Sequence, residues 1–204
     1  MHPGDHRVCF VGDSFTQGTG DAAGLGWPGR VAAAARAAGY DLTAYNLGVR
    51  RDTSADIAAR WQTECDARFR VACTPYIVFS FGANDMTSDD EALRVPIPQS
   101  VDNFLKIVGD AKARCRTLFI GPLPVGDATQ DIRIILLCAT YRVLARELGV
   151  PYLPLAQDLA GDPAWARAVA AGDGTHPCGD GYARVAARVI NWPAWWFSAP
   201  ASAG

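Results

Sequence analysis

The sequence predicts an α/β protein in which a five-stranded parallel sheet lies between two layers of helices. Short runs rich in β-branched and aromatic residues alternate along the chain with longer segments of helical composition, as in βαβ units. Runs such as YIVFSF at 76–81 are also almost continuously apolar, which is typical of strands that are covered on both faces. A three-layer α/β/α domain accounts for both observations.

The expected elements follow from these patterns in chain order. Strands are expected at 8–11, 41–47, 76–81 and 117–120, with a weaker one at 151–153. Helices are expected at 28–38, 53–69, 101–113 and 131–148, and a further pair at 163–171 and 179–189. No internal repeat or linker divides the chain, so residues 1–204 form one domain, with a disordered tail at 198–204.

Composition excludes several classes of function. The net charge of −2 gives no electrostatic reason to expect nucleic acid as a partner. No apolar run is long enough for a signal peptide or a membrane span, which favours the cytoplasm over secretion unless a leader has been trimmed. The six cysteines form no CxxC pair, so we expect reduced thiols and no metal site.

Polar and glycine-containing segments follow each of the first four predicted strands. Ser14 follows the first, Gly48 the second, FGAND (residues 81–85) the third, and GPLPVGD (residues 121–127) the fourth. In a parallel sheet these strand ends lie at one edge, where ligands bind. Ser14 is therefore placed where a nucleophile could act, although a helix cap is the alternative.

His176 is the best candidate for a general base. His2 and His6 lie in the N-terminal segment, whereas His176 stands three residues after Asp173 in DGTH. A serine hydroxyl needs an oriented base to become a nucleophile, and Ser-His-Asp is the standard arrangement. An α/β-hydrolase is disfavoured, because no glycine stands two residues after Ser14. Asp13 and Asp85 are interpreted as turn-shaping residues.

Four segments together resemble the sequence blocks of the SGNH (GDSL-type) hydrolases. These are GDS, NLGVRRDTS, FGAND and DGTH, in the order of the family, and the resemblance covers roughly residues 8 to 190. It implies the flavodoxin-like fold of that family and a triad of Ser14, His176 and Asp173. It also implies an oxyanion hole made by the N–H groups of Ser14 and Gly48 and the amide of Asn84. No metal or organic cofactor is implied.

Further residues are candidates for substrate binding. Arg50 could hold a carboxylate, a phosphate or a sugar hydroxyl, but a solvated Arg50-Arg51 pair, or salt bridges to nearby acids, is the favoured interpretation. The acids considered are Asp52, Asp89, Asp90 and Glu91. Leu123, Pro124 and Val125 could line an acyl or alcohol pocket, or pack within their loop.

The C-terminal segment contains Trp192, Trp195, Trp196 and Phe197. Packing onto the body of the domain is the favoured role of these rings. A contact between the subunits of a homo-oligomer and an apolar surface for lipid-like substrates are the alternatives.

The resulting hypothesis is a serine esterase that acts on a small-molecule, lipid or carbohydrate ester. Short-chain acyl or acetyl esters are favoured, while lysophospholipids and thioesters remain open, as does transfer of the acyl group to an alcohol. The alternative from another class is a non-catalytic, flavodoxin-like domain that binds phosphate in GDSFTQGTGD. That segment lacks the G-x-x-x-x-G-K-[ST] pattern, and a binding domain gives no reason for DGTH.

Overall fold

The structure is a computed structural model that describes residues 2–90 and 92–198. Its main sheet consists of β1 (His2–Gly12), β2 (Tyr40–Gly48), β3 (Thr74–Ser80), β6 (Arg116–Ile120) and β7 (Tyr152–Leu153). The strands are all parallel and lie in the order β2-β1-β3-β6-β7. The five-stranded parallel sheet predicted from the sequence is therefore confirmed. The predicted disordered tail lies outside the described residues, apart from Ser198.

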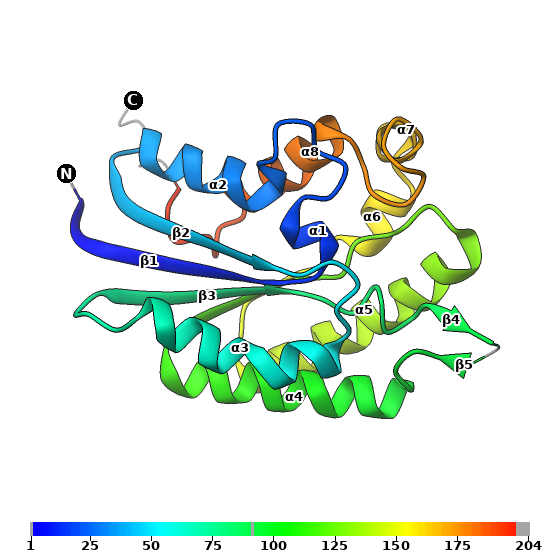
Figure 1. Ribbon diagram of the computed structural model, residues 1–204, viewed down its shortest axis with the longest axis horizontal. Coiled ribbons are helices and arrows are strands. Elements are labelled where there is room, and N and C mark those ends of the chain that lie inside the picture. The colour runs from blue at the N-terminus through cyan, green and yellow to red at the C-terminus, as the bar shows by residue number, and fades with distance from the viewer. Residues whose placement is uncertain (1, 91, 199–204) are drawn as a thin grey trace.

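Helices cover both faces of this sheet (Figure 1). One face is covered by α2 (Gly26–Ala37) and α8 (Gly179–Ile190), which pack against each other. The other is covered by α3 (Ser54–Arg68), α4 (Ile97–Arg114) and α5 (Ala128–Leu148). The three-layer arrangement expected from the alternating pattern is thus the one observed.

The helix boundaries follow from local capping chemistry. Thr53 and Asp56 form a capping box at the start of α3, in which each side chain accepts a hydrogen bond from the other residue's N–H. Helix α4 begins at Ile97, four residues before the predicted start, because Pro98 is tolerated in a first turn. Asp127 caps α5, which begins at Ala128, three residues before the predicted start.

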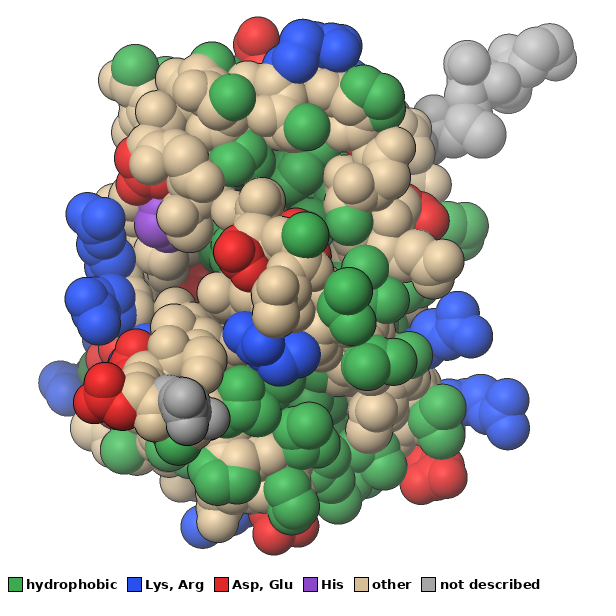
Figure 2. Space-filling model, turned by 90° about the vertical axis from the view of Figure 1, so that its right-hand side faces the viewer, with side chains coloured by type: hydrophobic (Ala, Val, Ile, Leu, Met, Phe, Trp, Pro, Cys, Tyr) green, Lys and Arg blue, Asp and Glu red, His purple; other side chains and the backbone are tan. Residues whose placement is uncertain are grey.

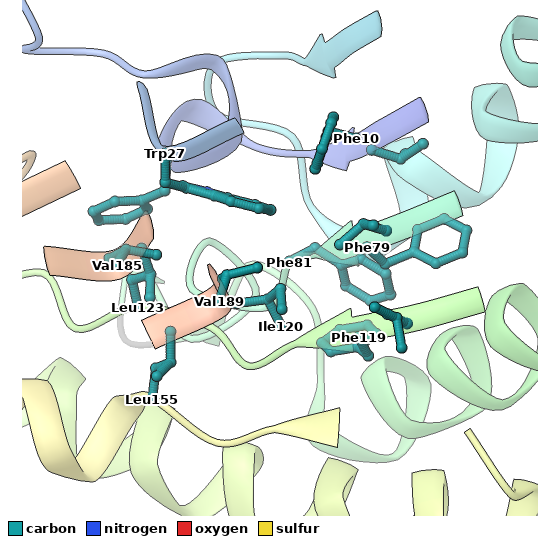
Figure 3. Close-up of a cluster of buried hydrophobic side chains, with 14 of the residues drawn as sticks. Phe10, Trp27, Phe79, Phe81, Phe119, Ile120, Leu123, Leu155, Val185 and Val189 are labelled. Carbon is teal, nitrogen blue, oxygen red and sulfur yellow. The ribbon is translucent and has the colours of Figure 1, made fainter. Parts of the chain in front are cut away.

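The central strands are apolar because they are buried on both sides. Val8, Phe10 and Val11 of β1 have no exposed surface, and neither have Val78 and Phe79 of the neighbouring β3. Their side chains form a hydrophobic core that continues into the helical layers, where Trp27 and Val185 are fully buried (Figure 3). This core holds the strand ends, and the loops that follow them, in fixed relative positions.

Three short elements and a hairpin interrupt or follow the main pattern. They are α1 (Ser14–Gln17), α6 (Ala156–Ala160), α7 (Pro163–Ala170) and the hairpin of β4 (Ser88–Asp89) and β5 (Ala92–Leu93). Only α7 was expected from the sequence. The others contain two to five residues, too few to show a helical or strand period.

The C-terminal aromatic segment packs onto the domain near the start of the strands. Trp195 and Phe197 are 3% exposed, and the Phe197 ring lies 5.2 Å from Tyr40 and 4.9 Å from Tyr76. Trp196 also lies against Tyr76, at 4.8 Å between ring centroids. Intramolecular packing is therefore the observed role. Trp192 and Trp196 are partly exposed, so a contact between subunits through this segment stays a prediction.

Candidate active site

Loops from distant parts of the chain meet beyond the carboxyl ends of the strands. Ser14 directly follows β1, Asn84 follows β3, and His176 lies in the loop between α7 and α8. All three line one cleft of about 520 Å³. Figure 2 looks onto the end of the molecule where these loops lie, and shows that this face is hollowed. The predicted edge of the sheet therefore does carry a cleft.

Ser14, His176 and Asp173 are joined by hydrogen bonds in a line. The Ser14 Oγ lies 2.7 Å from His176 Nε2, and His176 Nδ1 lies 2.8 Å from Asp173 Oδ2. Because an ionised carboxylate only accepts hydrogen bonds, Nδ1 carries the proton in this tautomer and Nε2 accepts from the serine hydroxyl. Ser14 and His176 are buried, at 3% and 7% exposure, so bulk water competes little for these bonds.

The serine is held at a sharp turn between β1 and α1. Asp13 Oδ1 accepts a hydrogen bond from the N–H of Phe15, which caps α1. A Cβ at Gly12 would lie 2.2 Å from the carbonyl oxygen of Ser80, so only glycine fits where β1 passes β3. The turn-shaping role expected of Asp13 is confirmed, and the same turn places Ser14 at the mouth of the cleft.

Asp173 is oriented by the backbone of its own loop. Its Oδ1 accepts from the N–H groups of Thr175 and His176, and its Oδ2 faces the imidazole. Partial burial alone would raise the pKa of Asp173. The hydrogen bonds from the His176 backbone, the His176 ring and the Thr175 backbone outweigh burial and lower that pKa to about 2. The carboxylate is therefore ionised at any pH suited to ester hydrolysis.

Two buried carboxyl groups support the site without entering the cleft. Burial raises the pKa of Asp13 to about 7, with smaller contributions from Asp85 and Asp52. Burial also raises the pKa of Asp85, which accepts hydrogen bonds from the N–H of Ser54 and the hydroxyl of Ser100. Asp85 therefore does more than shape a turn, because it ties the start of α3 to the first turn of α4 beside Asn84.

Asn84 lines the cleft with one of its two amide hydrogens already engaged. Its Nδ2 donates to the carbonyl oxygen of Asp52 at 2.9 Å. Asp52 is itself held by Arg60, whose Nε lies 2.6 Å from the carboxylate. An amide nitrogen carries two hydrogens, so this contact orients Asn84 and leaves a second donor for a ligand.

The predicted oxyanion role of Gly48 is not supported by the geometry. Its N–H donates to the side chain of Asn46 at 3.0 Å, and Gly48 is not among the residues that line the cleft. A Cβ at Gly48 would lie 2.1 Å from the backbone nitrogen of Gln17. Glycine stands here because β2 passes close to α1, and a side chain would clash with the backbone of Gln17. The assignment of the Gly48 N–H to the oxyanion hole stays a prediction.

Arg51, which the sequence did not single out as an N–H donor, also lies at the cleft. It lines the cleft and adopts φ of +73°, a left-handed conformation that is uncommon for a residue with a side chain. Among the described residues, no acceptor pairs with the backbone N–H of Arg51 or with that of Ser14. Positive φ usually indicates glycine or asparagine, so an arginine gave no signal of this conformation.

Only part of the predicted GPLPVGD pocket lies at the cleft. Val125 lines it, together with Phe15, whose ring lies 5.0 Å from that of His176. Leu123 instead belongs to the core near Val185 (Figure 3), with 1% exposure. The carbonyl of Pro124 accepts from the indole of Trp165. Leu123 and Pro124 do not line the cleft, and they follow the alternative considered from the sequence, packing within their loop.

Arg50 lies at the cleft, as its substrate-binding interpretation requires. It pairs with Asp173, at 3.8 Å, and with none of Asp52, Asp89 and Asp90, while Glu91 lies outside the described residues. Within the same described part of the chain, no group of three or more His, Cys, Asp or Glu residues could hold a metal ion. All six cysteines are free thiols, and no described helix is both long and apolar enough to cross a bilayer.

A serine paired with an imidazole and a carboxylate, at the strand ends of a parallel α/β sheet, has the arrangement of a serine hydrolase. The sequence model of the GDSL-like lipase/acylhydrolase family matches residues 10–184. The chain belongs to that family, and it is therefore a carboxylic ester hydrolase. A phosphate-binding domain without catalysis is set aside.

Solved structures agree with this assignment at the level of the fold. A lipase/acylhydrolase from Enterococcus faecalis superposes with a TM-score of 0.75 at 22% identity, over 90% of this chain and 93% of that one. An acetylxylan esterase from Geobacillus stearothermophilus superposes with a TM-score of 0.74 at 17% identity, over 90% and 92%. A comparison with curated protein sequences gave no match.

Proposed function

We propose that the protein hydrolyses esters of short acyl groups through an acyl-enzyme on Ser14. The observation that carries this proposal is the 2.7 Å contact between Ser14 Oγ and His176 Nε2, inside the cleft and backed by Asp173. A nucleophile, a general base and a group that orients the base thus lie in sequence within hydrogen-bond distance.

The first half of the reaction forms the acyl-enzyme. Ser14 Oγ attacks the ester carbonyl carbon while His176 Nε2 takes the hydroxyl proton, and the ionised Asp173 stabilises the imidazolium. His176 then gives that proton to the departing alcohol oxygen as the carbon–oxygen bond breaks. In the second half, His176 removes a proton from water, which attacks the carbonyl carbon of the acyl-enzyme. His176 then returns that proton to Ser14 Oγ as the bond between the acyl carbon and Oγ breaks, which releases the acid and the free serine.

Three donors are available for the negative charge that develops on the carbonyl oxygen. They are the backbone N–H of Ser14, the second hydrogen of the Asn84 amide and one further backbone N–H. The family resemblance assigns that third donor to Gly48, and the unpaired N–H of Arg51, which also lines the cleft, is the alternative. Removing one such donor lowers kcat by about 10²–10³ in the subtilisin example, so the three together would supply a large part of the rate.

The lining of the cleft favours a short acyl group. Of the residues that line it, Phe15 and Val125 are the two with large apolar side chains, whereas arginines, hydroxyl groups and amides make up most of the rest. A long acyl chain gains about 0.8 kcal/mol for each buried CH₂, but only where apolar surface receives it. The acetylxylan esterase is thus a closer guide to acyl size than a lipase would be.

Hydrolysis of p-nitrophenyl acetate, butyrate and octanoate tests the proposal. We expect kcat/KM to be highest for acetate or butyrate. Ser14→Ala and His176→Ala are each expected to lower kcat by about 10⁴–10⁶, the range seen for such residues in subtilisin, with Tm nearly unchanged. Turnover at the wild-type rate by a folded Ser14→Ala protein would refute the mechanism, and a preference for octanoate would refute the short acyl group.

A further inference from the structure

Three arginines lie in the same cleft as Ser14 and His176. Arg50 and Arg51 come from the loop between β2 and α3, and Arg94 directly follows the β4–β5 hairpin. Among the described residues that line the cleft, Asp127 is the one acid, and it caps α5 by accepting from the N–H of Gln130 at 2.7 Å. In a chain with a net charge of −2, the cleft is therefore a local concentration of positive charge.

Each guanidinium keeps donors that the protein does not use. Arg50 is 63% exposed and lies 3.8 Å from Asp173, beyond hydrogen-bond distance. Arg51 is exposed, and its side chain makes no ion pair or hydrogen bond with the described residues. Arg94 donates to the carbonyl oxygen of Arg51 at 2.9 Å and lies 3.8 Å from Asp89, an acid that is 61% exposed.

The backbone holds this group in a particular arrangement. The bond from Arg94 to the Arg51 carbonyl joins the hairpin to the loop after β2, and fixes two of the three arginines relative to each other. Arg51 has φ of +73°, a conformation that arginine adopts at an energetic cost and that glycine would adopt freely. Such strain is found most often at ligand sites, where the surrounding structure over-determines the backbone.

We infer that Arg50, Arg51 and Arg94 form a subsite for an anionic group, so that the preferred substrate is a short-chain ester that carries a carboxylate or a phosphate. A guanidinium presents paired donors that match both groups. This inference rests on the proposed function, because the anion is recognised within the cleft that holds Ser14. A solvated role of the Arg50-Arg51 pair accounts for the exposure of these two residues, but it gives no reason for the left-handed backbone of Arg51 or for its bond from Arg94.

Matched pairs of esters provide the test. On the alcohol side, 4-acetoxybenzoate is compared with its methyl ester, and 4-acetoxyphenyl phosphate with 4-acetoxyanisole. On the acyl side, a mono-p-nitrophenyl ester of a dicarboxylic acid is compared with its methyl-capped form. Each kcat/KM is divided by the second-order rate constant for hydrolysis of the same ester by hydroxide, measured where hydroxide attack dominates. This removes differences in intrinsic reactivity and leaves out the attack of a free carboxylate on its own ester. The readout is the ratio of the anionic to the neutral ester.

We expect at least one pair to favour the anionic ester by about tenfold, the effect of a partly solvated charged hydrogen bond. Because Arg50 and Arg51 are exposed, whereas Arg94 is partly buried, the ratio should fall as ionic strength rises from about 0.02 M to about 0.3 M. Comparing the carboxylate pair with the phosphate pair shows which anion the arginines prefer. Comparing the alcohol-side pairs with the acyl-side pair shows which half of the ester carries the anion.

The variants Arg50→Gln, Arg94→Gln and Arg51→Gly should each lower this ratio about three- to tenfold. Arg51→Gly keeps the backbone N–H and relieves the left-handed strain, so it should fold at least as well as the wild type. Arg146→Gln, at the opposite end of α5, removes the same charge outside the cleft and should leave the ratio unchanged.

Ratios near one or below in every pair of the wild type, or ratios that none of the three variants changes, would overturn the inference. Hydrolysis of the neutral esters by the Ser14→Ala variant is measured separately, because it tests the esterase mechanism and not the anionic subsite. If that hydrolysis is lost while the ratios stay near one, the esterase mechanism stands and only the anionic subsite fails. If Ser14→Ala hydrolyses neutral esters as the wild type does, the proposed function itself fails.

Discussion

The two ends of the parallel sheet differ in chemistry although the same strands run through both. At the end where the strands begin, Tyr40, Tyr76 and Phe197 pack ring against ring, and Trp195 is buried beside them. At the end where they finish, a cleft is lined by arginines and amides, and Arg51 is held in a left-handed conformation. Burial of apolar surface at the first end stabilises the folded protein. The polar groups at the second end are held in place at a cost to that stability.

This difference predicts whether a substitution should change mainly the stability of the protein or mainly its catalytic rate. Replacing a buried aromatic residue at the first end should lower the free energy of unfolding and leave catalysis in the folded molecules intact. Replacing a polar residue at the second end should lower the rate, and removing a buried charge there should raise stability. Three substitutions test this separation.

The largest expected effect on stability belongs to Trp195→Ala. Trp195 is 3% exposed and packs against Phe197, so its removal should lower the free energy of unfolding by about 3–5 kcal/mol. Urea denaturation measures the loss, and Leu136→Ala, at a side chain that is 63% exposed, is the control expected to stay within about 0.5 kcal/mol. A lowered kcat in Trp195→Ala with unchanged stability would contradict the separation of the two ends.

Asn84→Ala should affect the rate more than stability. Its amide donor would act mainly in the transition state, so kcat should fall by about 10²–10³ while KM changes little. Steady-state kinetics with p-nitrophenyl acetate measures both constants. Asn191→Ala removes an exposed amide that donates to the carbonyl of Ala187, and serves as the control. A destabilised Asn84→Ala protein with full kcat would show that Asn84 only shapes its turn.

The smallest expected effect belongs to Asp13→Asn, and its sign depends on pH. Burial holds the pKa of Asp13 near 7 in the folded protein, whereas an aspartic acid in an unfolded chain loses its proton near pH 3.9. Between these values the unfolded chain binds fewer protons, so wild-type stability falls as pH rises. Asparagine can still accept from Phe15 without that loss. We expect the variant to be more stable than the wild type by about 1–3 kcal/mol at pH 8, and no more stable at pH 3.

Urea denaturation at pH 3, 5 and 8 measures this effect. Asp162→Asn is the matched comparison, because Asp162 also caps a helix but its hydrogen bond from Arg184 lowers its pKa. It should change stability at pH 8 in the opposite direction. If the difference in free energy of unfolding between Asp13→Asn and the wild type did not vary with pH, the raised pKa of Asp13 in the folded protein would be contradicted.

The sequence predicted what depends on short local patterns. Continuous apolar runs predicted the buried strands, and the order of four short motifs predicted that Ser14, His176 and Asp173 meet. It did not predict the conformation of Arg51, because positive φ leaves a sequence signal only when glycine or asparagine is present. The family resemblance assigned Gly48 to the oxyanion hole, but the sequence could not show that a Cβ at this position would clash with the backbone of Gln17.

Labelling with a p-nitrophenyl alkylphosphonate tests the central claim most directly, because the phosphonate forms a bond with an activated serine and resists hydrolysis. Mass spectrometry of the intact protein and its peptides counts the adducts and locates them. The account predicts one adduct per chain, on Ser14, formed as esterase activity is lost, absent in Ser14→Ala and strongly slowed in His176→Ala. An adduct on another residue, or full activity in a protein whose Ser14 is labelled, would contradict it.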